Sequence, residues 1–256
     1  MIYVYTCIMG GFDNLMPPLV PEEAGVRHIC FTDVPVLPDV SPWEFRPIHD
    51  VGSPARTSRL PKILPHLMLP ADADYSIWID GNFQLAQPAS EIINQELRFD
   101  DWAAHRHPAR DCIYSEAEVL LKEKIGTPGL IMEQIERYSA LGYPAAHGLW
   151  ANGMIIRRHT PAVNALNEAW WKLYASGCER DQLSFPVARW QAGMQVNSMP
   201  HRGDVYSSDL MKFGWHAAWK DKPGNVVKRP ERERIAGRVA RLKAIAGDGG
   251  YIWRMY

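Results

Sequence analysis

An acidic and an amide side chain stand two positions apart where a strand is expected to end. Residues 75–80 carry the β-branched and aromatic side chains typical of a buried strand, and Gly81 then ends it. After such a turn Asp80 and Asn82 face one small volume, and their oxygens suit a Mg²⁺ or Mn²⁺ ion that bridges a diphosphate. The same triplet also forms a tight turn without any ligand, so the residues leave a metal site and a plain turn open.

Basic residues precede this strand. Residues 55–69 follow Ser53-Pro54, a helix start signal, and hold cations about one turn apart: Arg56, Arg59, Lys62 and His66. Placed before an acidic strand, such cations would clamp a diphosphate. The alternative is a basic helix face that only meets solvent.

A dense cluster of titratable residues follows the next expected strand, residues 102–107. Two histidines and two arginines fall within six positions, among them His105, His107 and Arg110. Phosphate binding, metal ligation and acceptor binding would each use such a cluster. Glu116 lies near the start of the helix that follows, where a carboxylate commonly interacts with the helix dipole.

Alternating strands and helices must position these side chains. The first two strands, residues 2–8 and 26–31, lead into loops that carry Asp13 and Asp33. In an open α/β sheet, ligands bind outside the carboxyl ends of the strands, where such loops gather. Further strands are expected at residues 43–48, 153–158 and 194–199, and helices at 87–97, 114–125, 128–141, 162–174 and 183–190. Asp181 and Gln182 open the last helix, where Asp is often a cap.

Length and composition indicate a globular protein. The 256 residues suffice for one large α/β domain, and 46% of them are hydrophobic and 22% charged. Four scattered cysteines without a Cys-x-x-Cys pair argue against a zinc knuckle or a disulfide framework and favour a reducing compartment. No signal peptide or membrane-spanning apolar run is found, so we expect a cytoplasmic protein, and we expect no nucleic-acid partner.

Tryptophan is abundant, with ten in the chain. Some lie in loop-like stretches, where an indole would stack on a sugar or a base, although core packing is the default expectation: Trp43, Trp150, Trp215 and Trp219. Beyond residue 199 the chain becomes irregular and would fold over the site as a lid. Residues 228–243 hold seven basic and two acidic residues with a narrow apolar stripe, which predicts a helix that either contacts anionic lipid or docks by its stripe.

The order of these features closely resembles that of one family, first catalogued as domain of unknown function 616 and now placed among the glycosyltransferases. Its plant members include mucilage-polysaccharide and turgor-regulation proteins, and they carry a membrane anchor that is not found here. The resemblance runs from about residue 2 to about residue 190 and rests on these stretches: Gly10-Gly11-Phe12-Asp13, Phe31-Thr32-Asp33, Trp78-Ile79-Asp80-Gly81-Asn82, His107-x-x-Arg110-x-Cys112-x-Tyr114-x-Glu116 and Arg180-Asp181-Gln182.

The resemblance implies a GT-A fold: a single Rossmann-like α/β/α domain with a mostly parallel central sheet. Residues 1–225 would form the catalytic domain, and residues 226–256 a basic helix or tail beside it. In such enzymes an Asp-x-Asp motif holds Mn²⁺ or Mg²⁺ on the diphosphate. Here Asp80-Gly81-Asn82 takes that place, with an amide that binds a cation more weakly than a carboxylate. The resemblance also implies His216 as the third metal ligand, with His201 in reserve, and Lys220 as a contact of the diphosphate.

The implied activity is transfer of a hexose from a UDP- or GDP-sugar to a glycan or glycolipid, in surface polysaccharide synthesis. Thr6 and Asp33 would meet the base and ribose, and Arg56 and Lys62 the leaving diphosphate. Other expected substrate contacts are His105, His107, Arg110 and Gln182. Asp181 would be the base of an inverting enzyme, with Glu116 second, whereas in a retaining enzyme Asp181 would orient the sugar.

Two other functions remain open from the sequence. A metal-dependent hydrolase would use Asp80, His105, His107 and Asp181 as ligands and acid or base, although no tight metal-ligand spacing is present. A non-catalytic nucleotide- or glycan-binding protein would explain the amide at Asn82. Fold alone does not decide among these three functions.

Overall fold

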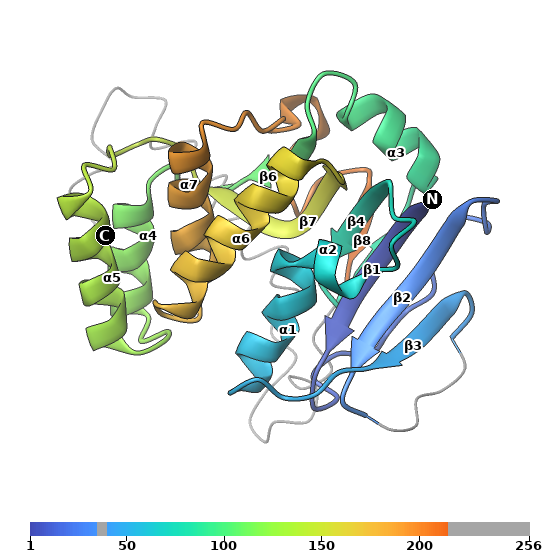
Figure 1. The fold of residues 1–256 in the computed structure, drawn as a ribbon, viewed down its shortest axis with the longest axis horizontal. Helices are drawn as coiled ribbons and strands as arrows, with labels where there is room; N and C mark the ends of the chain where they lie inside the picture. Colours follow the sequence, from blue (N-terminus) through green and yellow to red (C-terminus); the bar gives the residue numbers. More distant parts are fainter. Residues whose placement is uncertain (35–39, 215–256) are drawn as a thin grey trace.

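A computed structural model of the chain describes residues 1–34 and 40–214. Its centre is a six-stranded sheet with strand order β3-β2-β1-β4-β7-β6 (Figure 1). Neighbouring strands are parallel from β3 to β4, whereas β7 runs antiparallel to both β4 and β6. The bounds are β1 Ile2–Ile8, β2 Val26–Thr32, β3 Trp43–Pro47, β4 Tyr75–Ile79, β6 Trp102–Arg106 and β7 Trp150–Arg158. The predicted α/β class with a mostly parallel sheet is confirmed.

Helices cover one face of this sheet. Aromatic and aliphatic side chains of the sheet, such as Tyr5 and Trp78, pack there against Trp170 and Phe185 from two of the helices. The covering helices are α1 Pro54–Ile63, α2 Pro65–Met68, α6 Pro161–Ala175 and α7 Asp181–Ala192 (Figure 1). Cap residues fix where two of these helices begin, because Ser53 Oγ accepts from Arg56 N and Thr160 Oγ1 accepts from Val163 N.

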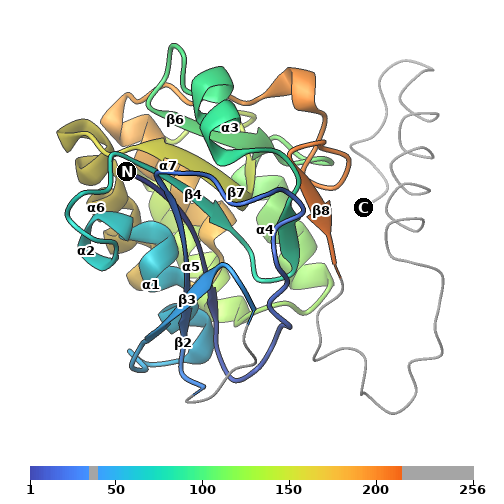
Figure 2. The same cartoon turned by 90° about the vertical axis from the view of Figure 1, so that its right-hand side faces the viewer.

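The opposite face packs against a helix and a small second sheet. Ile77 and Ile79 point to this side, while Ser76 and Trp78 alternate to the other, so β4 is buried on both faces. The covering elements are α3 Ala89–Glu96 and the antiparallel pair β5 Phe83–Leu85 and β8 Met211–Phe213 (Figure 2). A third apolar cluster joins α7 to α4 Ile113–Lys122 and α5 Pro128–Ala140.

The structure corrects several expectations. The strand expected at residues 194–199 is wrong: only Asn197 forms an isolated bridge, to Ala103, before the short 3₁₀ turn Pro200–Arg202. The short strands β5 and β8 carried no periodic signal and were not predicted. Trp43 and Trp150 lie in strands and are almost fully buried, so the default of core packing holds for both, while Trp215 and Trp219 lie outside the described residues.

The loops that carry the candidate site residues lie at one end of the strands, along a single side of the sheet. Strands β1, β4 and β6 end at this edge and the antiparallel β7 begins there, so Asp80, His107 and Ala151 come close together. The four cysteines are free and buried. Within the part of the chain that is described, none of the helices has the length and apolar character needed to cross a membrane.

Candidate active site

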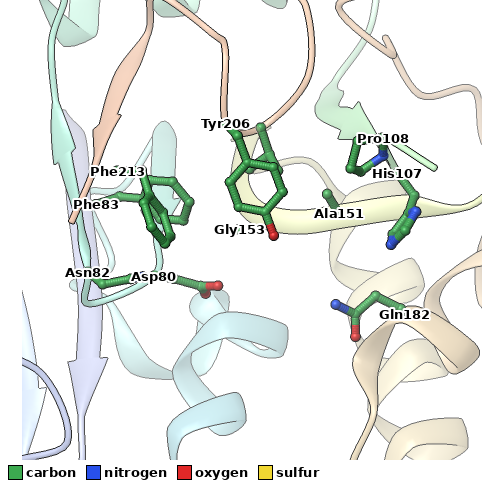
Figure 3. Close-up of a pocket in the computed structure, with 11 residues that line it drawn as sticks. Asp80, Asn82, Phe83, His107, Pro108, Ala151, Gly153, Gln182, Tyr206 and Phe213 are labelled. Atoms are coloured by element: carbon green, nitrogen blue, oxygen red, sulfur yellow. The ribbon is translucent and has the colours of Figure 1, made fainter. Parts of the chain in front are cut away.

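Asp80 follows the last residue of β4 and is held on one side of its carboxylate. Trp78 Nε1 donates to Oδ1 at 2.8 Å, and Lys62 Nζ lies 3.3 Å from the same atom. The backbone amide of Asp80 donates to Gly153 O of β7 at 2.9 Å. About a third of the side chain is exposed (33%), and the carboxylate points into a cavity (Figure 3). Oδ1 is therefore occupied, and Oδ2 is the atom available to a ligand.

Gly81 and Asn82 complete the turn. A Cβ on Gly81 would lie 2.9 Å from Ile8 Cγ1 and 3.1 Å from Asp13 Oδ2, so only glycine fits against the end of β1. Asn82 Nδ2 donates to Gly214 O at 3.2 Å, and Gly214 N donates back to Asn82 O at 2.6 Å. Because Nδ2 is engaged, Oδ1 is the atom of the amide that remains to accept a ligand.

A buried ion pair lies behind Asp80. Lys62 on α1 places Nζ 2.7 Å from Asp181 Oδ2, and Arg59 Nε lies 3.6 Å from the same oxygen. Burial by itself raises the pKa of the Asp181 carboxyl, but Lys62 and Arg59 outweigh it and bring the pKa down to about 2. Asp181 therefore stays ionised, and a carboxylate with so low a pKa is a weak proton acceptor.

The cavity between these elements has a volume of about 150 Å³. Asp80 and Gln182 face one another across it, and the Tyr206 hydroxyl points toward the space between them (Figure 3). The lining residues are Asp80, Asn82, Phe83, His107, Pro108, Ala151, Gly153, Gln182, Val205, Tyr206 and Phe213. We refer to it as the Asp80 cavity. It brings together four of the residues singled out in the sequence, Asp80, Asn82, His107 and Gln182.

His107 belongs to a network with Arg110 and Glu116. Its Nδ1 accepts from the backbone amides of Ala109 and Arg110 at 3.3 and 3.1 Å, and Arg110 Nη2 lies 3.2 Å from Nε2, so donors face both nitrogens of the ring. Burial lowers the pKa of His107 to about 3, and Arg110 and Arg180 add to this. Arg110 Nε donates to Glu116 Oε2 at 2.5 Å. Glu116 is thus buried in an ion pair outside the lining of the Asp80 cavity.

Four predicted substrate contacts lie away from the Asp80 cavity. Thr6 is fully buried inside β1, so the expected contact of its side chain with a nucleotide is corrected: the hydroxyl is enclosed within the sheet. Asp33 is exposed and accepts from Gly10 N at 2.7 Å. Arg56 faces Glu179 at 3.8 Å. His105 is 1% exposed on the α3 side of the sheet, so it does not join His107.

The residues that a metal-dependent hydrolase would use as ligands do not come together in the structure. His105 does not line the Asp80 cavity, and Asp181 is bound by Lys62. Within residues 1–34 and 40–214, no group of three or more His, Cys, Asp or Glu side chains could hold a metal ion. His216 and Lys220 lie outside the described residues. His201, the reserve ligand, contacts Glu96 at 3.1 Å and does not line the cavity.

The site also contains residues to which the sequence assigned no role of their own. Trp78 orients Asp80, and Phe83, Tyr206 and Phe213 form an aromatic wall. Arg59, named in the sequence among the cations of its helix, lies beside Asp181, one helical turn before Lys62. The aromatic wall had no signal in the sequence, because β8 joins the site from far along the chain.

The turn at Asp80 offers ligands for a divalent cation. Asp80 Oδ2 and Asn82 Oδ1 are two hard oxygen donors on one turn, which fits Mg²⁺ or Mn²⁺ if a diphosphate supplies further oxygens. Gly214, two positions before His216 in the sequence, is held against Asn82. The donor set thus fits a cation that binds together with its substrate.

A family model described as TOD1/MUCI70, glycosyltransferase-like domain, matches residues 47–202, more than half of the chain. The chain belongs to this TOD1/MUCI70 family. The match includes Lys62, Asp80, His107 and Asp181, whereas β1 and β2 precede it. The resemblance drawn from the sequence is thereby confirmed.

The chain is also similar to a plant protein and to solved structures of other proteins. The chain is 26% identical over 223 residues to the probable hexosyltransferase MUCI70 of Arabidopsis thaliana. The aligned segment covers 77% of this chain and 38% of that protein. It thus spans less than half of that relative's length. Among solved structures, apo mouse xyloside xylosyltransferase 1 has a TM-score of 0.44 at 9% identity, covering 77% of this chain and 84% of that one. Apo WbbM, a bifunctional glycosyltransferase, has a TM-score of 0.43 at 11% identity, covering 78% and 39%.

Proposed function

We propose that this member of the TOD1/MUCI70 family transfers a hexose from a nucleotide-sugar, a UDP- or GDP-sugar, to a glycan or glycolipid acceptor. The observation that carries the proposal is the Asp80 carboxylate. It stands at the carboxyl end of a central strand, beside Asn82, with Oδ1 fixed and Oδ2 facing the cavity. This is where ligands bind in open α/β sheets.

Cation binding is part of the proposal. Asp80 Oδ2 and Asn82 Oδ1 would hold Mn²⁺ or Mg²⁺, with His216 as a further ligand, and the ion would stabilise the charge of the departing nucleoside diphosphate. Trp78 and Lys62 keep Oδ1 of Asp80 engaged, so the carboxylate need not reorient when the donor arrives. The 150 Å³ cavity is smaller than a whole nucleotide-sugar site, which supports a role for it in holding only the diphosphate and sugar.

Asp181 and Glu116, the two candidates for the catalytic base, are both held in ion pairs. Asp181 is buried with Lys62 and has a pKa of about 2, and Glu116 is bonded to Arg110. We therefore assign Asp181 as a positioning residue that fixes Lys62, and through it Asp80. This arrangement favours the retaining alternative, in which the base of an inverting enzyme is not needed. Gln182 and His107 line the same cavity and would contact the sugar.

The cellular setting is proposed on the family's plant members and the sequence. The product would be a surface polysaccharide or glycolipid made on the cytoplasmic side of a membrane. The basic stretch at residues 228–243 would supply a peripheral contact with anionic lipid. That stretch lies outside the described residues.

Donor turnover tests the proposal. The purified protein is incubated with UDP- and GDP-hexoses, Mn²⁺ or Mg²⁺ and a set of glycan acceptors, and both the nucleoside diphosphate and the glycosylated product are measured. We expect one donor to be consumed with transfer to an acceptor, and Asp80→Asn to lower the rate by about 100-fold or more. Asp100→Asn, in the loop before β6, is the matched control and should keep the wild-type rate. Failure to consume any donor, or full activity in Asp80→Asn, would overturn the proposal.

A further inference from the structure

A second cavity, of about 290 Å³, opens at the end of α7. Its lining residues are His147, Arg189, Trp190, Gly193 and Gln195. Trp190 is half-buried and stands edge-on to Tyr143, with ring centres 5.6 Å apart. We refer to this second cavity as the Arg189 cavity. The Arg189 cavity therefore combines a cation with an aromatic wall, and none of its lining residues belongs to the Asp80 cavity.

Two guanidinium groups share one indole beside this cavity. Arg106 lies 4.6 Å from the ring centre of Trp150, and Arg189 lies 5.0 Å from it. Arg106 and Trp150 are cross-strand partners in β6 and β7, which places the first guanidinium on the ring. Gly148 leaves the space for it, because a Cβ there would collide with Arg106 Nη1 and lie 2.8 Å from Trp150 Cη2.

Within the described residues, this pair of cations has no carboxylate partner. Arg106 Nε donates to Ser198 Oγ and Arg189 Nη1 donates to Met194 O, each at 3.0 Å, so both bonds go to neutral groups. Arg189 Nε is buried without a hydrogen-bond partner. Burial lowers the pKa of the Arg189 guanidinium, and Arg106 beside it lowers the pKa further. Two like charges on one indole, with no carboxylate among their described partners, form a site that a bound anion would stabilise.

The two cavities are neighbours on the same edge of the sheet. Arg106 precedes His107, and Trp150 precedes Ala151, and the second member of each pair lines the Asp80 cavity. His107 N donates to Leu149 O at 2.9 Å, so the β6–β7 pairing continues between the cavities. Because Arg189 of the second cavity stands on Trp150 together with Arg106, the two cavities flank the same pair of strand ends.

We propose that the Arg189 cavity binds an anionic saccharide unit, with its acidic group on Arg189 and Arg106 and its ring against Trp190. A guanidinium binds a carboxylate or a phosphate through two parallel hydrogen bonds, and an indole offers the flat apolar face on which a sugar ring stacks. Its use as the acceptor subsite of a transferase rests on the function proposed above. The binding itself does not, because no residue of the Asp80 cavity takes part.

Calorimetric titration without any donor tests this site. The full chain is titrated with trisaccharides that end in glucuronate, in 6-phosphorylated glucose or in neutral glucose. We expect the acidic trisaccharides to bind and the neutral one to bind at least about tenfold more weakly, because it makes no charge-assisted hydrogen bonds. The two acidic ligands show whether a carboxylate or a phosphate is preferred. Binding should weaken further as the salt concentration rises.

Variants separate this site from the donor site. Arg189→Met and Arg106→Met keep the apolar stem of the side chain and should each weaken binding by about tenfold or more. Arg98→Met, which changes an arginine that stacks on Phe99, is the control and should bind like the wild type. Asp80→Ala should also keep acidic trisaccharide binding, even if the protein turns over no nucleotide-sugar. Equal binding of neutral and acidic trisaccharides, or unchanged binding in both folded arginine variants, would overturn the proposal.

Discussion

The ammonium of Lys62 lies 2.7 Å from Oδ2 of Asp181, and both side chains are almost completely buried. The same ammonium lies 3.3 Å from Asp80 Oδ1, so it links a carboxylate enclosed by the fold to the carboxylate that faces the cavity. A buried ion pair costs desolvation energy and contributes little net stability over an apolar pair. Its value here is orientation, because it fixes the position of Asp80.

Removing Lys62 should destabilise the protein strongly. Lys62→Met leaves Asp181 buried without its closest cation, and we expect the free energy of unfolding to fall by about 3–5 kcal/mol. The double variant Lys62→Met/Asp181→Leu should recover most of this loss. Urea unfolding measures both. Arg27→Met, which breaks an exposed pair with Glu44, should leave stability close to wild type. A single variant as stable as the wild type would show that the pair is not closed in solution.

The stability of the protein should decrease in acid partly because of His107. Its pKa in the folded state is about 3, below its ordinary value of 6.5, so the unfolded state binds the proton more readily. The contribution of neutral His107 to the free energy of unfolding is therefore fully present above pH 6.5 and is lost as the pH falls toward 3. Measured by urea unfolding from pH 8 to pH 4.5, His107→Gln should lose less stability than the wild type. If the free energy of unfolding of the two proteins changed with pH in the same way, His107 would not be a source of the acid sensitivity.

Gly81 should tolerate no side chain. In Gly81→Ala the new methyl would press on Ile8 and Asp13, and overpacking of this kind costs about 1–3 kcal/mol. The displaced turn should also weaken donor binding. Gly129→Ala is the matched control: nothing lies within 4 Å of its Cβ position in α5, so it should be neutral or slightly stabilising. If the melting temperatures of the two variants changed equally, the close packing at Gly81 would be refuted.

Trp78 should act on catalysis through Asp80. Trp78→Phe keeps most of the buried aromatic volume but removes the Nε1 donor to Oδ1, so the carboxylate is held by Lys62 alone. We expect kcat to fall by about tenfold or more, with KM for the acceptor unchanged, since one hydrogen bond to a carboxylate is lost. Trp102→Phe, in the same apolar cluster, controls for packing. Equal rates for Trp78→Phe and the wild type would show that this hydrogen bond does not position Asp80.

The sequence was sufficient to predict the turn at Asp80. A buried strand that ends on Asp-Gly-Asn has a local signal, and the basic residues of α1 carry helical spacing, so the position of Lys62 could be anticipated. Its partner could not, because the pairing of Lys62 with Asp181 depends on where the fold places the first residue of α7 relative to α1. Asp181, predicted as the base of an inverting enzyme, is paired with Lys62 in the structure.

Features built from distant segments escaped prediction. Phe83 and Phe213 are register partners in the β5–β8 pair, and three-residue strands carry no periodicity. Thr6 lies in a strand whose bounds were expected, but its side chain is fully buried, which the strand pattern alone did not reveal. The antiparallel direction of β7 was also not predicted, because strand composition does not encode orientation. It matters for function, since β7 brings Ala151 and Gly153 into the Asp80 cavity.

Thermal denaturation with UDP, GDP, CDP and ADP and their common sugars, each with Mn²⁺, Mg²⁺ or EDTA, tests the central claim most directly. A ligand that binds only the folded state raises its stability. We predict that one nucleotide, a uridine or guanosine diphosphate, raises the melting temperature only with a divalent cation. Asp80→Ala should abolish this shift and Asp100→Ala should keep it. If no nucleotide stabilises the protein, or if Asp80→Ala responds like the wild type, the Asp80 cavity is not a nucleotide-sugar site.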